Sequence, residues 1–313
     1  MNELRIPRRV VDMVTSADGE AGRRWLAELP GIVDRARRRW LLELAAPFEG
    51  GNFAYVAPAT LPGGSAAVLK VSLVDDETRH EADALTAWAG NGAVRLLDAD
   101  PAEGALLLER LVPGTSLEEH PDRDEAVGLG CGVLRRLWVD LPPGHPFAAV
   151  SELASRWARE LPERHLATRV LDDELVGRAV DACLALSRET ATPVLVNRDF
   201  HLGNVLSATR EPWLAIDPKP LAGEPVFDTG HLLRSLLPRR PERKRVHELA
   251  HRLAAELEVD AEAVRAWALV RSVEDALWSL ETGLGDPGRD IYVARILSSG
   301  RPRGPSNERL SSR

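Results

Sequence analysis

The spacing of hydrophobic positions changes along the first third of the chain. Apolar residues over 25–33 recur every three or four positions, which predicts a helical opening segment that extends to about residue 44. Two shorter apolar runs, 53–56 and 66–71, lie on either side of the sequence Leu-Pro-Gly-Gly at 61–64. Short apolar runs separated by a Pro-Gly turn are typical of a β-hairpin, so a β-rich region is expected after the first helix.

Helical spacing returns over residues 75–89, and a second hairpin is expected from the runs 94–97 and 106–109 around a polar turn. From Ser116 onward helical periodicity dominates, and only two short strand-like runs, which lie within residues 194–217, interrupt it. The chain is therefore expected to combine a small β-rich part with a larger helical part, which is an α+β organisation.

A Val-Pro-Gly sequence at 112–114 marks the change in composition between these two parts. It predicts a boundary between an N-terminal domain of residues 1–111 and a C-terminal domain of residues 112–300. The last residues, 301–313, are rich in Ser, Arg, Pro and Gly, a composition that predicts a flexible tail. The sequence contains no internal repeat.

Composition narrows the range of functions. The 313 residues are 44% hydrophobic and 28% charged, as in ordinary globular proteins, and the net charge of −8 argues against a nucleic-acid partner. The first residues lack the apolar core of a signal peptide, and no apolar run is long enough to span a membrane, so a cytoplasmic protein without a membrane partner is expected. Cys131 and Cys183 fall in helical patterns, which favours buried free thiols over a disulfide. The sequence does not define the oligomeric state.

Three polar side chains within residues 194–217 form the strongest chemical pattern. Asp199 and Asn204 lie five positions apart in a polar loop, and Asp217 follows the apolar run Trp-Leu-Ala-Ile. Phosphoryl transfer uses this kind of set, because one carboxylate accepts the hydroxyl proton while an Asn and a second carboxylate hold Mg²⁺ against the triphosphate of ATP. A polar loop between two buried strands would produce the same pattern, so the interpretation depends on other parts of the chain.

Lys70 lies within the apolar run 66–71, where an ammonium group is costly unless it meets an anion or reaches water. In a kinase such a lysine holds the phosphates of ATP and is oriented by a glutamate on the next helix. Glu81, in the following helical segment, could fill that role, and Glu77 is an alternative one turn earlier. The other interpretation is an edge-strand lysine that faces water, followed by solvent-exposed acids.

Two further segments fit a nucleotide site. Gly50 and Gly51 precede the first strand, where backbone N–H groups could approach a phosphate, although hairpin ends also commonly carry glycines. The run 106–111 ends before the Pro-Gly link, and there the carbonyl of Glu109 and the N–H of Leu111 could face an adenine edge. The lysine strand, the acidic helix, this hinge and the Asp-Asn loop follow one another in the order of a two-lobed kinase-like protein.

With these residues in place, the chain resembles the aminoglycoside phosphotransferase family, and within it the branch of streptomycin 6-phosphotransferases and hydroxyurea phosphotransferases. The strings that carry the resemblance lie between about residues 47 and 283 and include HEADALTAW, VNRDFHLGNVL and EPWLAIDPKPLAGEP. The resemblance implies a two-lobed protein-kinase-like fold, use of ATP and Mg²⁺, and phosphorylation of a hydroxyl on a small molecule. Asp199 then matches the catalytic base, Asn204 and Asp217 the metal ligands, and Lys70 the phosphate-holding lysine.

The chain departs from the family pattern at the catalytic loop. Where the family usually has His-Gly-Asp, this chain has Asn197, Arg198 and Asp199, so the acid is kept and Asn197 must supply the hydrogen bonds that stabilise the loop. His201 is flanked by apolar residues and is expected to brace the loop rather than to transfer protons. Lys219 could reach phosphate or pair with the carboxylate two residues before it, and the sequence leaves both open.

The acceptor is the part of the function that the sequence defines least. The resemblance predicts a cationic amino sugar or cyclitol of the streptomycin type, and carboxylates and an aromatic ring that could bind it occur at Asp228, Glu274, Asp275 and Trp278. Hydroxyurea or another small metabolite is the alternative acceptor on the same fold. A nucleotide-binding regulator without turnover is a further alternative, which the complete set of kinase residues disfavours.

One competing motif points to a different class of enzyme. His247, Glu248 and His251 match the pattern His-Glu-x-x-His, in which two histidines one helical turn apart bind Zn²⁺ and the glutamate acts as general base. The same segment also fits an amphipathic helix, and no spacing rule selects a third ligand, so a zinc hydrolase is the least favoured alternative. A Gly-x-Gly-x-x-Gly match at 283–288 follows a helical segment and is better explained by a helix end.

Overall fold

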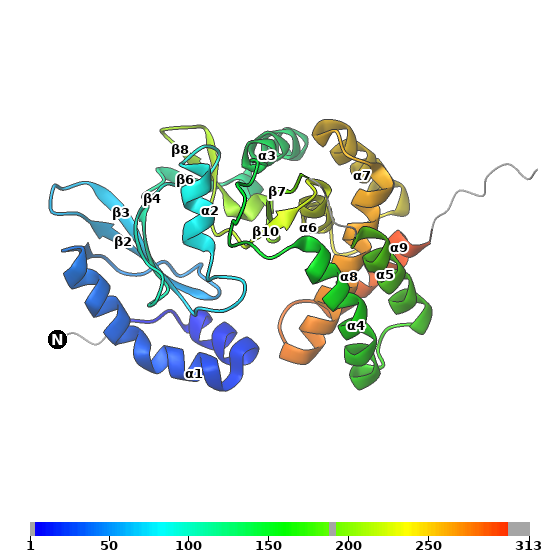
Figure 1. The fold of residues 1–313 in the computed structure, drawn as a ribbon, viewed down its shortest axis with the longest axis horizontal. Coiled ribbons are helices and arrows are strands. Elements are labelled where there is room, and N and C mark those ends of the chain that lie inside the picture. The colour runs from blue at the N-terminus through cyan, green and yellow to red at the C-terminus, as the bar shows by residue number, and fades with distance from the viewer. Residues whose placement is uncertain (1–3, 188–191, 300–313) are drawn as a thin grey trace, which may run out of the picture.

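The computed structural model describes residues 4–187 and 192–299, which form a small β-rich lobe and a larger helical lobe (Figure 1). The small lobe is built on one antiparallel sheet with the strand order β1-β2-β3-β5-β4. Its strands are β1 (Glu43–Leu44), β2 (Ala54–Thr60), β3 (Ala66–Ser72), β4 (Leu96–Asp100) and β5 (Ala105–Glu109). Both predicted hairpins are confirmed, although β4 begins slightly later in the chain than expected.

The two faces of this sheet have different partners because side chains alternate along each strand. On β3, Leu69 and Val71 point to one face and pack under helix α1 (Arg8–Arg39). Lys70 lies between them and points to the opposite face, which it shares with Leu106 of β5 and which is turned toward the helical lobe. The strand period thus places a lysine on the inner face of the sheet.

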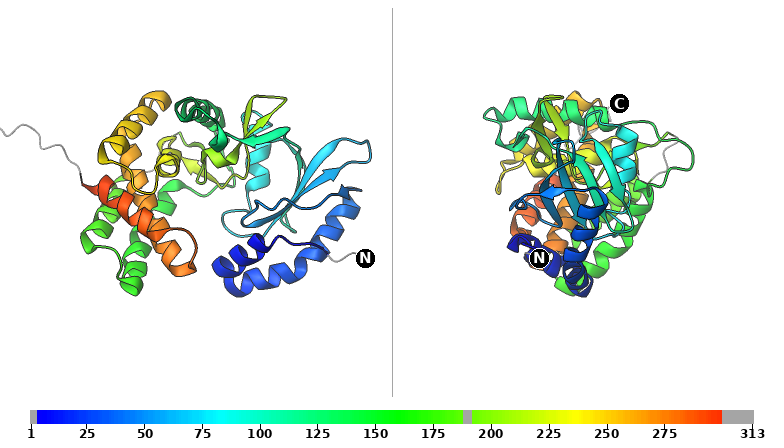
Figure 2. Two further views of the ribbon diagram at one scale, coloured as in Figure 1. Left: turned by 180° about the vertical axis from the view of Figure 1, so that it is seen from behind. Right: turned by 90° about the vertical axis from the view of Figure 1, so that its left-hand side faces the viewer.

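Helix α1 runs along the outer face of the sheet, and α2 (Glu81–Trp88) lies on the inner side, next to the helical lobe (Figures 1 and 2). α1 bends at Gly19, which has a left-handed φ of 53° that favours glycine, and it ends a few residues earlier than expected. The helix predicted over 75–89 is also shorter than expected. The side chain of Asp75 accepts hydrogen bonds from the backbone N–H groups two and three positions later and thereby holds a turn ahead of α2.

Helices dominate the C-terminal lobe, as the sequence predicts. In the residues that the structure describes, they are α3 (Arg123–Leu137), α4 (Val150–Thr168), α5 (Asp173–Leu186), α6 (Val226–Leu236), α7 (Arg243–Leu257), α8 (Ala261–Thr282) and α9 (Pro287–Ser298), with the 3₁₀ turns η1 (Leu117–Glu119) and η2 (Leu202–Asn204).

The described part of this lobe also contains five short strands, and four of them follow Ser116, where two were predicted. β7 (Val194–Asn197) pairs with β10 (Pro220–Gly223), while β6 (Pro113–Ser116), β8 (Val205–Ala208) and β9 (Trp213–Ala215) form a second small sheet. The prediction was wrong because strands of three or four residues carry too little alternation to be recognised.

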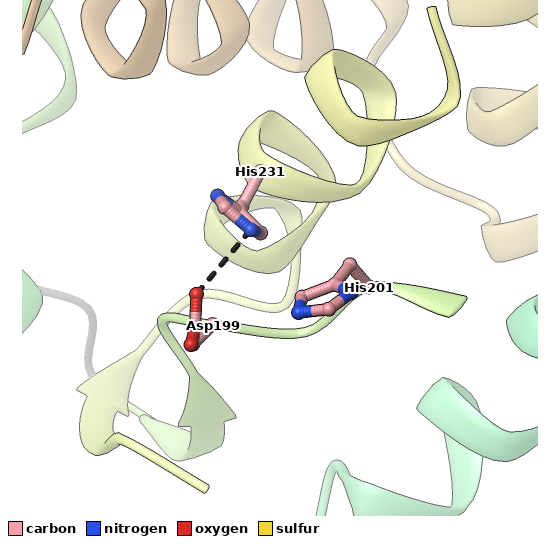
Figure 3. Close-up of side chains that lie close together, drawn as sticks. All are labelled: Asp199, His201 and His231. Carbon is pink, nitrogen blue, oxygen red and sulfur yellow. Dashed lines mark ion pairs between the residues drawn. The ribbon is translucent and has the colours of Figure 1, made fainter. Parts of the chain in front are cut away.

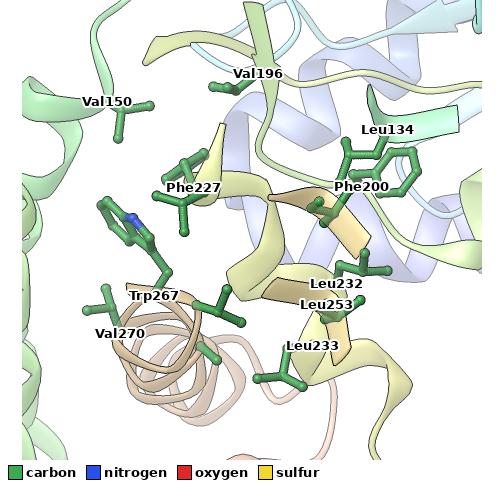
Figure 4. Close-up of a cluster of buried hydrophobic side chains, with 14 of the residues drawn as sticks. Leu134, Val150, Val196, Phe200, Phe227, Leu232, Leu233, Leu253, Trp267 and Val270 are labelled. Carbon is green, nitrogen blue, oxygen red and sulfur yellow. The ribbon is translucent and has the colours of Figure 1, made fainter. Parts of the chain in front are cut away.

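A continuous hydrophobic core packs α6 against α8 (Figure 4). The rings of Phe227 and Trp267 meet edge to face, with their centroids 4.9 Å apart. The two helices approach closely at Gly230, where an added Cβ would lie 2.7 Å from the Cβ of Trp267 and 2.8 Å from its carbonyl carbon. Glycine at this position therefore sets the distance between α6 and α8.

The lobes join where the chain leaves the five-stranded sheet at Glu109 and enters β6 at Pro113. β6 pairs with β8 of the helical lobe, so the change from one lobe to the other takes only a few residues. The exact domain limits stay a prediction, and the predicted tail at 301–313 lies outside the described residues.

Two other features of the chain can be placed in the structure. Cys131 and Cys183 are buried free thiols, and burial raises the pKa of each to about 12. Within the described ranges, the helices lack the combination of length and apolar character that is needed to cross a bilayer.

The close approach of α6 and α8 predicts a large effect of a small substitution. Overpacking a tight helix contact costs about 1–3 kcal/mol, so we expect Gly230→Ala to lower the melting temperature by about 2–6 °C in calorimetry. Gly132→Ala is the matched control, because Gly132 lies inside α3 with nothing within 4 Å of an added Cβ. It should be neutral or stabilising by up to about 1 kcal/mol. Equal melting temperatures for the two variants would contradict the packing described above.

Candidate active site

The loop between β7 and β8 carries the predicted catalytic residues and is held from within by Asn197. This buried side chain accepts hydrogen bonds through its amide oxygen from the backbone N–H groups of Asp199 (3.1 Å) and Lys219 (3.0 Å). Phe200 and Leu202 are buried and anchor the loop in the core. Asp199 is thereby presented at the edge of the lobe, with 26% of its side chain exposed.

A second buried polar residue supports the same loop from helix α6. The carboxylate of Asp228 accepts hydrogen bonds from the backbone N–H of Asn197 (2.8 Å) and from the indole N–H of Trp138 (2.9 Å). Burial raises the pKa of the Asp228 carboxyl well above its ordinary range, and the two donors offset part of this rise. Asp228 is a predicted acceptor-binding residue, but its burial and its occupied oxygens place it among the supports of the loop.

Asn204 and Asp217 lie together at one end of the loop. The backbone N–H of Ile216 donates to the carbonyl of Asn204 (2.8 Å), which holds the two segments side by side. The side-chain amide of Asn204 donates to the carbonyl of Asp199 (3.2 Å), so its amide oxygen is left to accept from or coordinate another group. Asp217 has a left-handed φ of 55°, and half of its side chain is exposed. Carboxylate and amide oxygens are ligands that suit Mg²⁺.

Lys70 joins the sheet to this group. Its buried ammonium contacts Glu81 of α2 at 2.5 Å and also the carboxylate of Asp217 in the other lobe. Burial disfavours the charged form, but the two carboxylates outweigh it and raise the pKa of Lys70. Burial raises the pKa of Glu81 to about 7 against the opposing effect of Lys70. Since β3 lies in the middle of the sheet, the alternative of an edge-strand lysine facing water is wrong.

Glu77 forms a second ion-pair link between the lobes. It lies in the turn before α2 and pairs with Lys219 at 2.8 Å and with Arg198, both of which belong to the helical lobe. Burial opposes ionisation, but the charges of Lys219 and Arg198 lower the pKa of Glu77 to about 2. Lys219 also lies 3.9 Å from the carboxylate of Asp199, so in this structure its ammonium pairs with Glu77 and approaches Asp199, and it forms no ion pair with Asp217.

Gly50 and Gly51 lie in the connection between β1 and β2, which we call the glycine loop (residues 45–53). An added Cβ on Gly51 would come within 2.9 Å of the carbonyl oxygen of Ala54, so this turn requires glycine. At the end of the loop the ring of Phe53 meets that of Trp278 on α8, with centroids 6.4 Å apart. The loop therefore reaches the helical lobe, and Trp278, a predicted acceptor residue, lies at that contact.

The glycine loop is also tied to the segment around the start of α1. Arg5 pairs with Glu49, and Arg9 donates to Asn52 at 2.6 Å. These contacts involve exposed side chains on both sides of the two glycines. The loop is consequently held at two points by the residues that precede and begin the first helix.

The predicted hinge lies where β5 ends. The carboxylate of Glu109 accepts from the backbone N–H of Arg95 (2.9 Å) and pairs with Arg210 at 2.6 Å. The side chain of Glu109 is therefore occupied by contacts within the protein, and only main-chain groups are left to contact an adenine base. Leu111 is buried two residues later. The contacts of the Glu109 carbonyl and the Leu111 N–H with adenine stay a prediction.

The two acidic residues predicted on α8 are already paired with arginines. Glu274 lies 3.2 Å from Arg271 and 3.6 Å from Arg164, and Asp275 lies 2.7 Å from Arg234. A cationic acceptor would have to take the place of an arginine in one of these pairs. The sequence gives no sign of this, because an acid on a helix has the same local pattern whether it faces a ligand or an arginine.

His231 of α6 belongs to the site although the sequence analysis did not select it. Its Nε2 lies 3.3 Å from Oδ1 of Asp199 (Figure 3), and its Nδ1 lies 3.4 Å from a guanidinium nitrogen of Arg271. Burial, followed by the charges of neighbouring arginines, lowers the pKa of His231 well below its ordinary value, so the ring is neutral at pH 7. His201 faces the same carboxylate from the loop, where its Nδ1 accepts from the N–H of Gly203 at 3.1 Å.

The zinc-protease motif does not assemble a site around itself. Its residues lie on α7, where Glu248 is 3.5 Å from Lys244. Among the described residues, a single group of histidine, cysteine and acidic side chains is close enough to share a metal ion: Asp199, His201 and His231. The zinc-hydrolase alternative therefore gains no support from the structure.

A sheet lysine paired with a helix glutamate, a short hinge and an Asp-Asn loop facing them together define a kinase-like protein. Solved structures agree with this fold. A choline/ethanolamine kinase family protein from Mesorhizobium loti matches with a TM-score of 0.60 and 16% identity, covering 86% of this chain and 95% of that one. A thermostable mutant of an aminoglycoside phosphotransferase, in complex with ADP and hygromycin B, gives a TM-score of 0.59 at 16% identity, covering 86% and 99%.

The chain belongs to the aminoglycoside/hydroxyurea antibiotic resistance kinase family, whose sequence profile matches residues 39–283. It is 39% identical to the hydroxyurea phosphotransferase of Kitasatospora aureofaciens over 303 residues, which cover 94% of this chain and 86% of that protein. It is 34% identical to the streptomycin 6-kinase of Streptomyces griseus over 290 residues, 90% of this chain and 93% of that protein. The resemblance inferred from the sequence is confirmed, and the protein is a phosphotransferase.

The lowered pKa of Glu77 gives a test of the second link between the lobes. Because its folded-state pKa lies below the unfolded value, Glu77 stabilises the protein above about pH 4.5, and this contribution is lost as the pH falls toward 2. We expect Glu77→Gln to lower the free energy of unfolding at pH 7 by about 1–2 kcal/mol, allowing for partial exposure, and to flatten its pH dependence below pH 5.

Urea denaturation at several pH values would measure both effects. Glu20→Gln is the control, because Glu20 also has an arginine partner but is 78% exposed. It should change the free energy of unfolding by less than about 0.5 kcal/mol at every pH. A Glu77→Gln variant that follows the wild-type pH dependence would show that the link does not stabilise the protein in solution.

Proposed function

We propose that the protein transfers the γ-phosphate of ATP to a hydroxyl of an aminoglycoside-type acceptor, in the manner of a streptomycin 6-kinase. The proposal is supported above all by the convergence of five side chains from the two lobes: Lys70, Glu81, Asp199, Asn204 and Asp217. Phosphoryl transfer needs this combination of a base, cation ligands and a phosphate-holding ammonium. Such a reaction would inactivate an antibiotic. Because it needs ATP, it would take place in the cytoplasm.

In this proposal Asp199 orients the acceptor hydroxyl and accepts its proton. Its backbone is fixed by Asn197, and its carboxylate is partly exposed, so it can meet an incoming hydroxyl. The ammonium of Lys219 lies 3.9 Å from the same carboxylate and would stand close to the phosphoryl group during transfer. A fixed positive charge there stabilises the charge that develops on the transferring oxygens. Little covalent chemistry is required of the protein beyond this positioning.

Asn204 and Asp217 are the residues that would hold Mg²⁺, which supplies charge neutralisation at the triphosphate when it is bound. These oxygen ligands suit Mg²⁺. The side-chain hydrogen bond of Asn204 uses its amide nitrogen, so the amide oxygen remains available, and the side chain of Asp217 is half exposed. Lys70 would hold the phosphates, with Glu81 keeping its ammonium in place. The adenine is expected at the main chain of the hinge, and the two glycines of the glycine loop are expected near the phosphates.

A second acceptor, hydroxyurea, is favoured by two observations. The acids of α8 that a polycationic acceptor would use are paired with arginines, as described for Glu274 and Asp275. A small neutral acceptor needs no such exchange of partners. The identity of 39% to a hydroxyurea phosphotransferase, against 34% to a streptomycin 6-kinase, points in the same direction. The phosphoryl-transfer machinery is the same for both acceptors.

The role of Asp199 predicts a loss of turnover without a loss of nucleotide binding. Asp199→Asn keeps the shape of the side chain but removes the base, so we expect kcat for acceptor-dependent ADP release to fall by about 10²–10⁴-fold. The Kd for MgATP, measured by calorimetry, should change by less than about twofold, since no phosphate contact is removed. Asp181→Asn on α5, an exposed position, is the control and should be unchanged. A variant that lost ATP binding would contradict the role given to Asp199.

The two acceptors can be separated by their dependence on salt. Binding of a cationic acceptor by carboxylates is screened by ions, so the KM for streptomycin should rise severalfold between low salt and about 0.5 M NaCl. The KM for neutral hydroxyurea should stay nearly constant. Measuring kcat/KM for both compounds with purified protein identifies the better acceptor. Phosphorylation of neither compound, with MgATP still bound, would move the search to other small hydroxyl acceptors.

A further inference from the structure

Two histidines, His201 and His231, lie beside the carboxylate of Asp199, and the proposed reaction does not yet use them. One atom each of Asp199, His201 and His231 lies within 4.8 Å of the others, and both rings are directed toward the carboxylate (Figure 3). One carboxylate and two imidazoles could bind a transition metal such as Zn²⁺. They could equally form a set of hydrogen-bond donors around an anion. Which nitrogen of each ring carries the proton decides between a metal site and a set of hydrogen-bond donors.

The contacts of the two Nδ1 atoms show that both rings act as hydrogen-bond donors through Nε2 and not as metal ligands. A histidine that binds a metal through Nε2 normally donates its Nδ1–H to an acceptor. Here Nδ1 of His201 accepts from the N–H of Gly203 at 3.1 Å, and Nδ1 of His231 lies 3.4 Å from a guanidinium nitrogen of Arg271, which can only donate. Both rings are consequently in the form that carries its proton on Nε2. In that form neither Nε2 has a lone pair for a metal.

We infer that His231 is a positioning residue for the catalytic base. Arg271 fixes the tautomer of His231, and Nε2 of that ring lies 3.3 Å from Oδ1 of Asp199, close enough for the Nε2–H to donate to this oxygen. One oxygen of Asp199 is thereby held by the protein, and Oδ2, which lies 3.9 Å from Lys219, is left for the acceptor hydroxyl. The inference rests on the proposed function only in giving Asp199 the role of base.

The surroundings keep the ring neutral, as this role requires. Positive groups face His231 from its own helix (Arg234), from α8 (Arg271) and from the segment after β9 (Lys219), and His201 faces it from the loop. The acid that contacts it is Asp199. The cations and burial together disfavour a second proton on the ring. His231 therefore donates a hydrogen bond without adding a charge that would compete with the transferred proton.

The packing of α6 explains why this contact is available. The close approach at Gly230 brings α6 against α8, so that Arg271 can reach the residue that follows Gly230. The same helix carries Asp228, whose carboxylate holds the backbone of the loop. α6 thus supports the backbone of the loop through one residue and the catalytic carboxylate through another.

Three substitutions of His231 test the contact. The amide nitrogen of a glutamine reaches the position of Nε2, whereas that of an asparagine reaches only the position of Nδ1, and leucine has no donor. We expect His231→Gln to keep kcat within about fivefold, and His231→Asn and His231→Leu to lower it about 10- to 100-fold, with the Kd for MgATP unchanged.

A measurement that needs no acceptor separates this inference from the proposed function. ¹⁵N NMR of labelled histidine should show His231, identified by loss of its signal in His231→Gln, as a neutral ring protonated on Nε2 at pH 7, and Asp199→Asn should shift that signal. An imidazolium, or a ring protonated on Nδ1, would overturn the inference even if the kinase reaction is found. The expected signal without phosphorylation of any acceptor would leave the contact standing and count against the proposed function alone.

Two kinetic outcomes would also overturn the inference. Equal losses of kcat in all three variants, accompanied by equally lowered melting temperatures, would show that His231 only fills space. The second outcome concerns Zn²⁺. If micromolar Zn²⁺ inhibited the wild type but not His231→Gln, and if the NMR signal of His231 shifted when Zn²⁺ was added, the three side chains would form a metal site instead.

Discussion

The buried ammonium group of Lys70 is the constraint on which the arrangement of the two lobes depends. A buried charge is tolerated only where opposite charges contact it. Removing one partner of a buried ion pair destabilises the protein by more than formation of the whole pair stabilises it. One counter-charge comes from Glu81 on the adjacent helix and the other from Asp217 in the second lobe. The sheet, α2 and the segment after β9 are therefore fixed relative to one another by the need to neutralise a single ammonium group.

Around this group the site is held together mainly by pairs of opposite charges, while hydrophobic packing holds the helices that carry them. Glu77 bridges the lobes through Lys219 and Arg198, and the acids of α8 are matched by arginines. Glu77 keeps its charge because its partners are present, as its lowered pKa shows. A ligand that enters such a network exchanges partners with it, so its affinity depends on the difference between two sets of ion pairs and not on one attraction.

The sequence predicted correctly those elements and site residues that are defined by contiguous residues. The two hairpins, the lysine within an apolar strand and the spacing of Asp199 and Asn204 all follow from local pattern, and the structure brings those side chains together. His231 could not be found in this way, because a histidine in a helix gains its meaning only from the loop and the arginine that the fold places against it. For the same reason the acid at Asp228 was assigned to the acceptor, although it is buried under the loop.

The attachment of the glycine loop to the beginning of α1 has a consequence for conformational entropy. A free loop must lose many backbone states when it closes on a ligand, and that loss weakens binding. The contacts of Arg5 with Glu49 and of Arg9 with Asn52, together with the ring contact of Phe53 and Trp278, restrict these states beforehand. Closing of the loop on a ligand would then cost less conformational entropy than closing of a free loop of the same length.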